Sequence, residues 1–340
     1  MTRSKIKPTL MRRIASFWIF VFFTVILSGC AASASPTLTS SFFAGYMTPT
    51  FASHPTSPAN SFRIVAYATE AVIPNLIPYS QLTYINYAFL VPNSDGTFVP
   101  LIDSWKLQQI VSEAHAHNVR VLISVGGWGT DQQFEQMALD PRTRSAFVAN
   151  LSAFINQYQL DGADIDWEYP KPGQSSQNFL VLIKELRAAL NGKLLTAAVV
   201  AYGDENGLGV PTDAFALLDF VNVMAYDGPD HGTMDQFNQA LSYWKTRGLS
   251  SEKTVVGVPF YSRPGEVPYS KLVASNPTAA QVDSFNYLGA LENYNGIPTI
   301  QAKTKIAVQQ TGGIMFWNLD DDASGDLSLV KAIYQTVDAP

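Results

Sequence analysis

The sequence predicts an α/β protein built as a closed (β/α)8 TIM barrel. Eight short apolar runs of strand length occur between residues 62 and 338, and amphipathic segments with helical spacing lie between them. Strands that alternate with helices are joined by right-handed crossovers and lie parallel in one sheet. A closed barrel of eight such units takes about 250 residues, which fits this chain of 340 residues as a single domain.

The predicted strands are short apolar runs. They are Arg63–Ala68, Thr83–Leu90, Val119–Val125, Gly162–Trp167, Leu194–Ala201, Phe220–Tyr226, Thr254–Phe260 and Gly313–Trp317. An open, doubly wound sheet is the alternative, and it usually carries a glycine-rich phosphate-binding turn after its first strand. Here Tyr67-Ala68-Thr69-Glu70 stands at that position, which favours the barrel. Apolar residues at helical spacing mark clear helices within 107–114, 147–158 and 179–186.

Composition narrows the function. The chain is 47% hydrophobic and 15% charged, with a formal net charge of −6, and it has one cysteine, Cys30, so no intramolecular disulfide is possible. Five of the 22 basic side chains lie in residues 1–30, which contain no acidic one, so the remainder has 17 basic against 28 acidic side chains. An excess of acid argues against nucleic-acid binding, which needs basic patches. The four histidines show no metal-ligand spacing, and we predict neither a metal nor a cofactor.

The first 29 residues have the pattern of an export signal. Residues 3–13 are basic, and the uncharged, mostly apolar run 14–27 is too short to span a bilayer as a helix. The sequence Leu27-Ser28-Gly29-Cys30 resembles the lipobox of bacterial lipoproteins, which implies cleavage before Cys30 and lipidation of its thiol. An ordinary signal peptide or an uncleaved anchor is the alternative. No Asp follows Cys30, which favours placement on the outer membrane or cell surface over inner-membrane retention.

Residues 30–61 are rich in Ala, Ser, Thr and Pro, a composition typical of a tether. An extra strand or arm packed on the domain is the alternative interpretation. The three predicted parts of the chain are therefore a signal at 1–29, a tether at 30–61 and the barrel domain at 62–340.

The most informative segment is the acidic strand that contains Asp164, Asp166 and Glu168. These residues are spaced by two, so on a strand their side chains point to one face. Ile165 and Trp167 then point to the other face, toward the helices. In a barrel the acids face inward and rise toward the carboxyl end, where barrel enzymes hold their sites. Burial and mutual repulsion favour at least one bound proton, as a general acid requires. A solvated run of charges and a calcium loop are weaker interpretations, since the segment lacks EF-hand spacing.

Five segments together resemble glycoside hydrolase family 18, the chitinases and endo-β-N-acetylglucosaminidases. In chain order they are Ser124-Val125-Gly126-Gly127-Trp128, Asp161-Gly162-Ala163-Asp164-Ile165-Asp166-Trp167-Glu168, Met224-Ala225-Tyr226-Asp227, Gly257-Val258-Pro259-Phe260-Tyr261 and Gly312-Gly313-Ile314-Met315-Phe316-Trp317. The acidic segment is the most specific of them. The resemblance spans about residues 62–335 and implies hydrolysis of β-1,4 linkages in chitin or other glycans that contain N-acetylglucosamine.

The resemblance also implies a retaining, substrate-assisted mechanism in which the substrate's own acetamide oxygen attacks the anomeric carbon. Spacing alone does not decide the nucleophile, because residues two apart on a strand approach the separation of a carboxylate pair. On this interpretation Glu168 is the general acid and base, and Asp166 holds the acetamide N–H. Asp164 shares a proton with Asp166, and Tyr226 donates its hydroxyl to the acetamide oxygen.

Further residues are predicted to bind the glycan. Trp317 is the stacking floor, Trp128 is a sugar platform, and Asp227 bonds a sugar hydroxyl. Side-chain alternation places Met224 with Tyr226 on the inner face. The remaining members of the predicted set are Gly126, Gly127, Tyr67 and Phe89. Barrel packing, a helix cap for Asp227 and a tight turn for the glycines are the alternatives.

Residues 262–311 leave little room for the α+β subdomain that many relatives insert after strand seven, so we expect a barrel without the full insertion. Two other functions stay open. One is an endo-β-N-acetylglucosaminidase acting on N-glycans or peptidoglycan-type glycans, and the other is a non-catalytic, lectin-like chitin binder. The presence of Glu168, Asp166, Asp164 and Tyr226 argues against the second.

Overall fold

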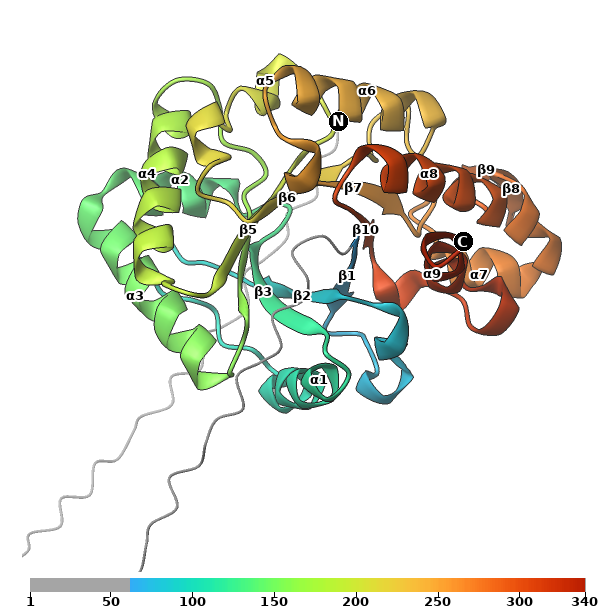
Figure 1. Cartoon of the computed structure of the whole chain (residues 1–340), viewed down its shortest axis with the longest axis horizontal. Helices are drawn as coiled ribbons and strands as arrows, with labels where there is room; N and C mark the ends of the chain where they lie inside the picture. The colour runs from blue at the N-terminus through green and yellow to red at the C-terminus, as the bar shows by residue number, and fades with distance from the viewer. Residues whose placement is uncertain (1–61, 340) are drawn as a thin grey trace, which may run out of the picture. The chain divides into compact units, whose positions relative to one another are not determined.

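The computed structural model describes residues 62–339. Eight parallel strands close into a barrel in the order β1-β10-β7-β6-β5-β4-β3-β2 (Figure 1). The barrel strands are β1 (Arg63–Thr69), β2 (Tyr84–Leu90), β3 (Arg120–Gly126), β4 (Gly162–Asp166), β5 (Leu194–Val200), β6 (Phe220–Met224), β7 (Thr254–Pro259) and β10 (Gly313–Trp317). This confirms the predicted barrel and all eight predicted strands, whose ends differ by no more than two residues. The predicted signal, Cys30 and the tether up to residue 61 lie outside the described residues.

Helices surround the strands (Figure 1). They are α1 (Ser104–Ala116), α2 (Asp131–Leu139), α3 (Pro141–Gln157), α4 (Gln174–Ala189), α5 (Asp204–Gly207), α6 (Met234–Thr246), α7 (Tyr269–Ser275), α8 (Ile297–Gln310) and α9 (Leu329–Val337). The three predicted apolar stripes lie on α1, α3 and α4. Within residues 62–339, none of these helices combines the length and apolarity needed to cross a membrane.

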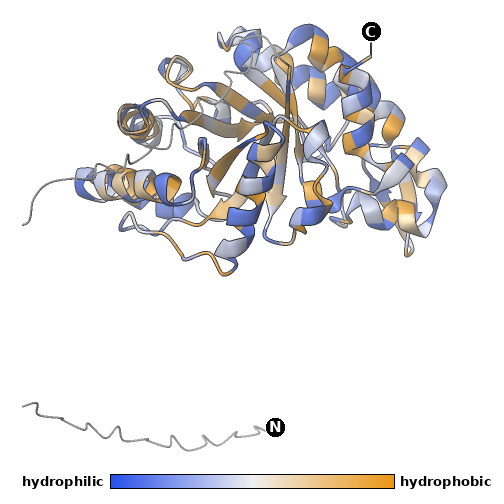
Figure 2. Cartoon of the chain, turned by 60° about the horizontal axis from the view of Figure 1, so that its bottom comes forward, coloured by the Kyte–Doolittle hydropathy of each residue, from blue (hydrophilic) through white to orange (hydrophobic). Residues whose placement is uncertain are grey.

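The core has two parts, as side-chain alternation requires of a closed sheet. One part lies between the strands and the helices and includes Ile165 and Trp167. The other fills the barrel and includes Tyr67, Met224 and Tyr226. Figure 2 shows orange segments on the strands at the centre and mixed hydropathy on the helices around them. The two faces of the acidic strand are therefore divided as predicted.

After β7 the chain forms α7 and then a two-stranded antiparallel hairpin of β8 (Ser284–Tyr287) and β9 (Ala290–Asn293). This hairpin and α7 lie within residues 262–311, the segment that leaves little room for a full subdomain. Arg263, just after β7, pairs its backbone with Asn293 at the end of the hairpin. The hairpin thus holds the segment that follows β7 next to the carboxyl end of the barrel.

Candidate active site

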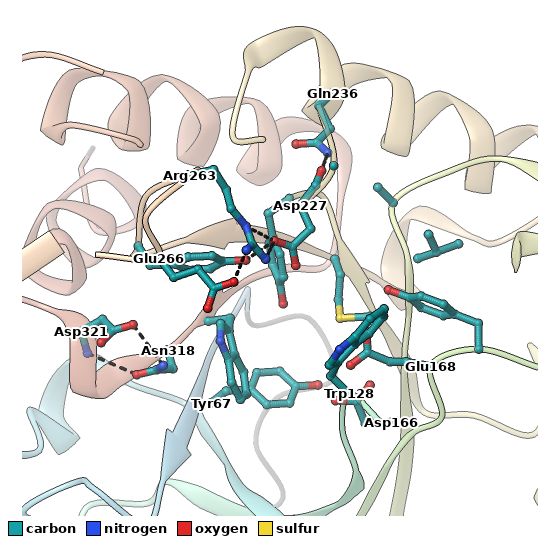
Figure 3. A pocket seen from close by; sticks show the side chains of 18 of the residues that line it. Tyr67, Trp128, Asp166, Glu168, Asp227, Gln236, Arg263, Glu266, Asn318 and Asp321 are labelled. Atoms are coloured by element: carbon teal, nitrogen blue, oxygen red, sulfur yellow. Dashed lines mark hydrogen bonds and ion pairs between the residues drawn. The ribbon is translucent and has the colours of Figure 1, made fainter. Parts of the chain in front are cut away.

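A cavity of about 760 Å³ lies at the carboxyl ends of the strands. All eight barrel strands contribute to its lining, through residues at their carboxyl ends or in the loops that follow them. They include nine predicted site residues, namely Tyr67, Phe89, Trp128, Asp166, Glu168, Met224, Tyr226, Asp227 and Trp317. Figure 3 shows Glu168 and Asp166 beside Trp128, with Arg263 and Asp227 across the pocket. The structure thus brings together residues up to 250 positions apart in the sequence.

Asp164 lies beneath this cavity, fully buried inside the barrel. Its carboxylate accepts four hydrogen bonds, from Tyr67 Oη at 2.8 Å, Ser124 Oγ at 2.9 Å, Thr196 Oγ1 at 2.6 Å and Asn222 Nδ2 at 3.1 Å. Burial raises the pKa of Asp164 above its ordinary value, and these hydrogen bonds offset that rise only in part. Hydrogen bonds to a carboxylate favour its ionised form. The proton that Asp164 is predicted to share with Asp166 stays a prediction.

Asp166 and Glu168 rise from Asp164 into the cavity. Asp166 is 3% exposed, and among the described residues its Oδ1 atom has no hydrogen-bond partner. Burial, with the charges of Glu168 and Asp164, raises the pKa of Asp166 well above its ordinary value. Burial also raises the pKa of Glu168 to about 7; a hydrogen bond from Tyr169 lowers this pKa and the charge of Asp227 raises it. The two carboxyls therefore hold a proton near neutral pH, as acid catalysis requires.

Tyr226 lies on the same side of the cavity. Its ring is buried in the barrel core with Met224, and its hydroxyl lies 3.9 Å from Met315 Sδ, a weak contact. The charges of Asp166 and Glu168 act on this hydroxyl and contribute to its raised pKa, behind burial and the neighbouring Tyr261. Tyr226 therefore keeps its proton and remains a hydrogen-bond donor next to the acid pair.

Aromatic rings form one wall of the cavity. Phe89 stacks on Trp317 with ring centroids 5.4 Å apart and planes 19° apart, and Tyr67 lies tilted against Trp317 at 5.8 Å. Trp128 is 82% exposed at the rim. A flat aromatic surface between fixed polar groups suits the apolar face of a sugar ring.

The two predicted glycines do not line the cavity but lie next to residues that do. A Cβ on Gly126 would meet the backbone oxygen of Asp166 at 2.2 Å, and one on Gly127 would meet the ring of Phe89 at 2.7 Å. Both glycines have φ in the left-handed region, at +120° and +89°. They allow close packing behind Asp166 and Phe89, and they are absent from the lining of the cavity itself.

Asp227 is held by a set of partners at the cavity rim. Its Oδ1 atom accepts hydrogen bonds from Tyr261 Oη at 2.6 Å and from Arg263 Nη2 at 2.6 Å and Nε at 3.0 Å. Arg263 also pairs with Glu266. The backbone N–H of Asp227 donates to His231 Nδ1, and its carbonyl accepts from Gln236 Nε2. Asp227 thus does not cap a helix, and the residue lines the cavity.

Several lining residues were not found by sequence reasoning. They are Tyr169, Tyr202, Gln236, Glu266, Asn318 and Asp321. Five of them follow the carboxyl end of a strand or lie in a loop beyond it, where no periodic signal marks them. Gln236 lies in the first turn of α6. Tyr169 adjoins the acidic segment and Asn318 follows Trp317 directly, so their positions in the sequence were a usable signal. Glu266 and Gln236 offered none.

Comparison with known proteins agrees with this arrangement. Residues 63–322 match the model of a family described as glycosyl hydrolases family 18. The structure resembles the family 18 chitinase ChiB from the chitin utilization locus of Flavobacterium johnsoniae, with a TM-score of 0.72 and 28% identity over 82% of this chain and 94% of that chain. A chitinase from Bacteroides thetaiotaomicron gives a TM-score of 0.72 and 27% identity over 82% and 97% of the two chains.

An endochitinase from Manduca sexta is 31% identical over 227 residues, which are 55% of this chain and 41% of that protein. The chain covers less than two thirds of the length of such curated relatives. The similarity therefore concerns the barrel and its site.

Proposed function

Since the chain belongs to family 18 of the glycosyl hydrolases and is a chitinase-like glycoside hydrolase, we propose that it cleaves β-1,4 linkages between N-acetylglucosamine units, with Glu168 as general acid and base. The observation that carries this proposal is the meeting of Glu168, Asp166 and Tyr226 in one cavity beside Trp317. The pKa of Glu168, raised to about 7 by burial, supports its role as an acid near neutral pH.

In the first step, Glu168 gives its proton to the oxygen that bridges the two sugars. The acetamide oxygen of the substrate attacks the anomeric carbon as the bridging bond breaks, which leaves a cyclic, positively charged intermediate and a free hydroxyl on the leaving sugar. In the second step, Glu168 takes a proton from water. The water oxygen attacks the anomeric carbon and opens the ring that the acetamide oxygen had formed. The product therefore keeps the β configuration.

Asp166 and Tyr226 bind the acetamide group of the substrate in this proposal. The unpartnered Oδ1 of Asp166 supports a role as acceptor for the acetamide N–H, and its negative charge stabilises the cyclic intermediate. The hydroxyl of Tyr226 donates to the acetamide oxygen and aims it at the anomeric carbon. Both contacts fix the reacting atoms before bond breaking, which is a large part of enzymatic rate enhancement.

For Asp164 we propose a role other than the shared proton that the family resemblance implies. Because its oxygens are occupied by four donors, we assign the mobile proton to Asp166 and Glu168. Asp164 then acts as a fixed charge below them. Its repulsion raises the pKa of Asp166 and keeps a proton on the pair.

The test is hydrolysis of the hexamer of N-acetylglucosamine, with the anomeric form of the first products followed by NMR. We expect β anomers at early times. Release of α anomers would exclude the assisted mechanism. Cleavage of a high-mannose glycoprotein but not of the hexamer would overturn the substrate assignment while leaving the chemistry in place.

We also propose that the chain is exported and anchored to a bacterial membrane through a lipid on Cys30. The charged and apolar segments before Cys30 and the small residues Ser28 and Gly29 support this. Metabolic labelling with a radioactive fatty acid should label the wild type and not Cys30→Ser. Equal labelling of the two proteins would refute the anchor.

A further inference from the structure

Three consecutive aspartates, Asp320, Asp321 and Asp322, follow the last barrel strand. The outer two have structural partners. Asp320 Oδ2 accepts from the backbone N–H of Thr69 at 2.9 Å and from its hydroxyl at 2.7 Å, which ties this turn to the end of β1. Asp322 accepts from the backbone N–H of Leu329 at 2.8 Å and from Ser328 Oγ at 2.6 Å, at the start of α9. Neither of these two side chains lines the catalytic cavity.

Asp321 lies between them and does line the cavity. Its Oδ2 accepts from Asn318 Nδ2 at 3.2 Å, and its own N–H donates to Asn318 Oδ1 at 3.2 Å. Asn318 follows Trp317 directly, so this pair places the Asp321 carboxylate one step beyond the aromatic floor. Figure 3 shows Asp321 and Asn318 at the opposite end of the pocket from Glu168. Asp321 therefore lies beyond Trp317, at the end of the cavity away from Glu168, so a sugar that it contacted would be a neighbour of the reacting one.

The charges around the cavity are unbalanced. The charged residues that line it are Asp166, Glu168, Asp227, Glu266, Asp321 and Arg263. The single cation, Arg263, is already paired with Asp227 and Glu266. Among residues 62–339, no lysine, arginine or histidine forms an ion pair with Asp321. A fully acetylated glycan is neutral and has no group that would balance this carboxylate.

We propose that Asp321 determines specificity by binding the ammonium group of a glucosamine unit next to the reacting sugar, so that partially de-N-acetylated chitin is a substrate. This inference rests on the proposed function and deepens it. The reacting unit itself must keep its acetamide, because that group is the nucleophile. The neighbouring unit has no such requirement, and a free amine there places a cation against the one cavity carboxylate that has neither a catalytic role nor a cationic partner.

The environment of Asp321 favours a cation over a sugar hydroxyl. Burial and the charge of Asp320 raise the pKa of Asp321 to about 7. An ammonium group at hydrogen-bond distance would lower that pKa and restore the ionised carboxylate, so the two charges stabilise each other. A hydroxyl lacks this effect, and it would bind an asparagine amide at the same position about as well. The difference between a carboxylate and an amide is therefore the quantity to test.

The experiment compares two substrates for the wild type and for Asp321→Asn, which removes the charge and keeps the shape. One substrate is the fully acetylated hexamer, and the other is soluble chitosan with about half of its units de-N-acetylated. We expect Asp321→Asn to lower kcat/KM on chitosan roughly fivefold more than it lowers kcat/KM on the hexamer, the size expected of one partly exposed ion pair. Mass spectrometry of the products should show that glucosamine next to the cleaved unit becomes rarer in the variant.

Asp326→Asn is the matched control, since it makes the same charge change on the same segment at a side chain that is 94% exposed and paired with Lys331. It should change neither rate. Equal loss on both substrates by Asp321→Asn would indicate a hydroxyl contact, and an unchanged chitosan rate would indicate no contact; either result overturns the inference. If the wild type fails to cleave the acetylated hexamer, the proposed function itself is wrong, and this inference falls with it.

A second measurement needs no variant. Salt screens an ion pair at a partly exposed site but hardly affects the binding of a neutral sugar. Raising NaCl from about 0.02 M to about 0.5 M should therefore lower wild-type kcat/KM on chitosan and leave the hexamer rate unchanged. A chitosan rate that does not respond to salt would overturn the proposal even if Asp321→Asn failed to fold.

Discussion

Asp227 and Arg263 form an ion pair at the rim of the cavity, with Arg263 Nη2 2.6 Å from Asp227 Oδ1. The charge of Asp227 also raises the pKa of Glu168. We therefore expect Asp227→Asn to lower that pKa, both by removing a negative charge and by leaving Arg263 less neutralised. The alkaline limb of the pH–rate profile on the acetylated hexamer should move to lower pH.

Asp140→Asn is the control for this prediction, because Asp140 pairs with Arg142 outside the cavity. It should leave the profile in place. A profile for Asp227→Asn that does not move would show that the two carboxyls are not electrostatically coupled.

Glu168 gives a second prediction, which separates activity from stability. A general acid must be protonated, so wild-type kcat/KM should fall as pH rises through about 7. Because the pKa in the folded protein is above the ordinary value, the folded state binds more protons. The contribution of Glu168 to the free energy of unfolding is thus fully present below pH ~4.5 and is lost as pH rises to about 7.

Glu168→Gln should abolish turnover while binding of the hexamer remains. Its melting temperature relative to the wild type should increase between pH 4.5 and 8, since glutamine cannot ionise; the gain is at most about 3 kcal/mol. A variant with near wild-type rates would remove Glu168 from the mechanism.

Gly127 supplies a third prediction with a close control. Gly127→Ala places a methyl group 2.7 Å from the Phe89 ring, whereas Gly129→Ala, at almost the same φ of +88°, meets no atom within 4 Å. Both changes cost about 1–2 kcal/mol of left-handed backbone strain. Gly127→Ala should cost about 1–3 kcal/mol more through overpacking.

Phe89 stacks on Trp317, so only Gly127→Ala should also lower kcat/KM on the hexamer. Thermal melting and kinetics of the two variants test this prediction. Equal behaviour of both would mean that Phe89 moves aside freely.

The fourth prediction concerns Lys303. It is fully buried on α8, and its Nζ atom donates to Gly232 O and Asn295 Oδ1, both at 2.7 Å. Gly232 N–H in turn donates to Gln236 Oε1, whose amide group holds the carbonyl of Asp227. We expect Lys303→Met to loosen this loop and raise KM for the hexamer severalfold, with a smaller effect on kcat.

Two effects of Lys303→Met on stability oppose each other, because a buried charge is removed while Asn295 loses a partner. We therefore expect the melting temperature to stay within a few degrees of the wild-type value. Thr304→Val is the control, since the hydroxyl of Thr304 bonds only within its own helix, to Ile300 O. A KM that is unchanged in Lys303→Met would show that the loop does not depend on this lysine.

The strands and the inward direction of the acids could be predicted because both follow from local repetition. Apolar runs mark strands wherever both faces are buried, and a spacing of two fixes the face on which Asp164, Asp166 and Glu168 lie. These rules need no knowledge of distant residues, so all eight strands were found.

The rest of the site depends on tertiary contacts. Whether Asp227 binds a sugar or a protein group is decided by Arg263 and Tyr261, which lie beyond another strand. Whether Asp164 is ionised depends on burial and on four donors from other strands, none of which the spacing of the acids reveals. Asp321 differs from the two aspartates beside it because Thr69 and the start of α9 bind those neighbours, and these contacts are not visible in the sequence.

The donors around Asp164 come from β1, β3, β5 and β6. One carboxylate therefore links β4 to its neighbours β3 and β5 and also to β1 and β6, which do not pair with β4. Removing that carboxylate would leave all four donors without their partner in an apolar interior. Engineering that replaces the acid pair with other chemistry must therefore either retain Asp164 or redesign all four strands together. The carboxylate that we propose to act as a fixed charge below the acid pair is therefore also the group that connects these strands inside the barrel.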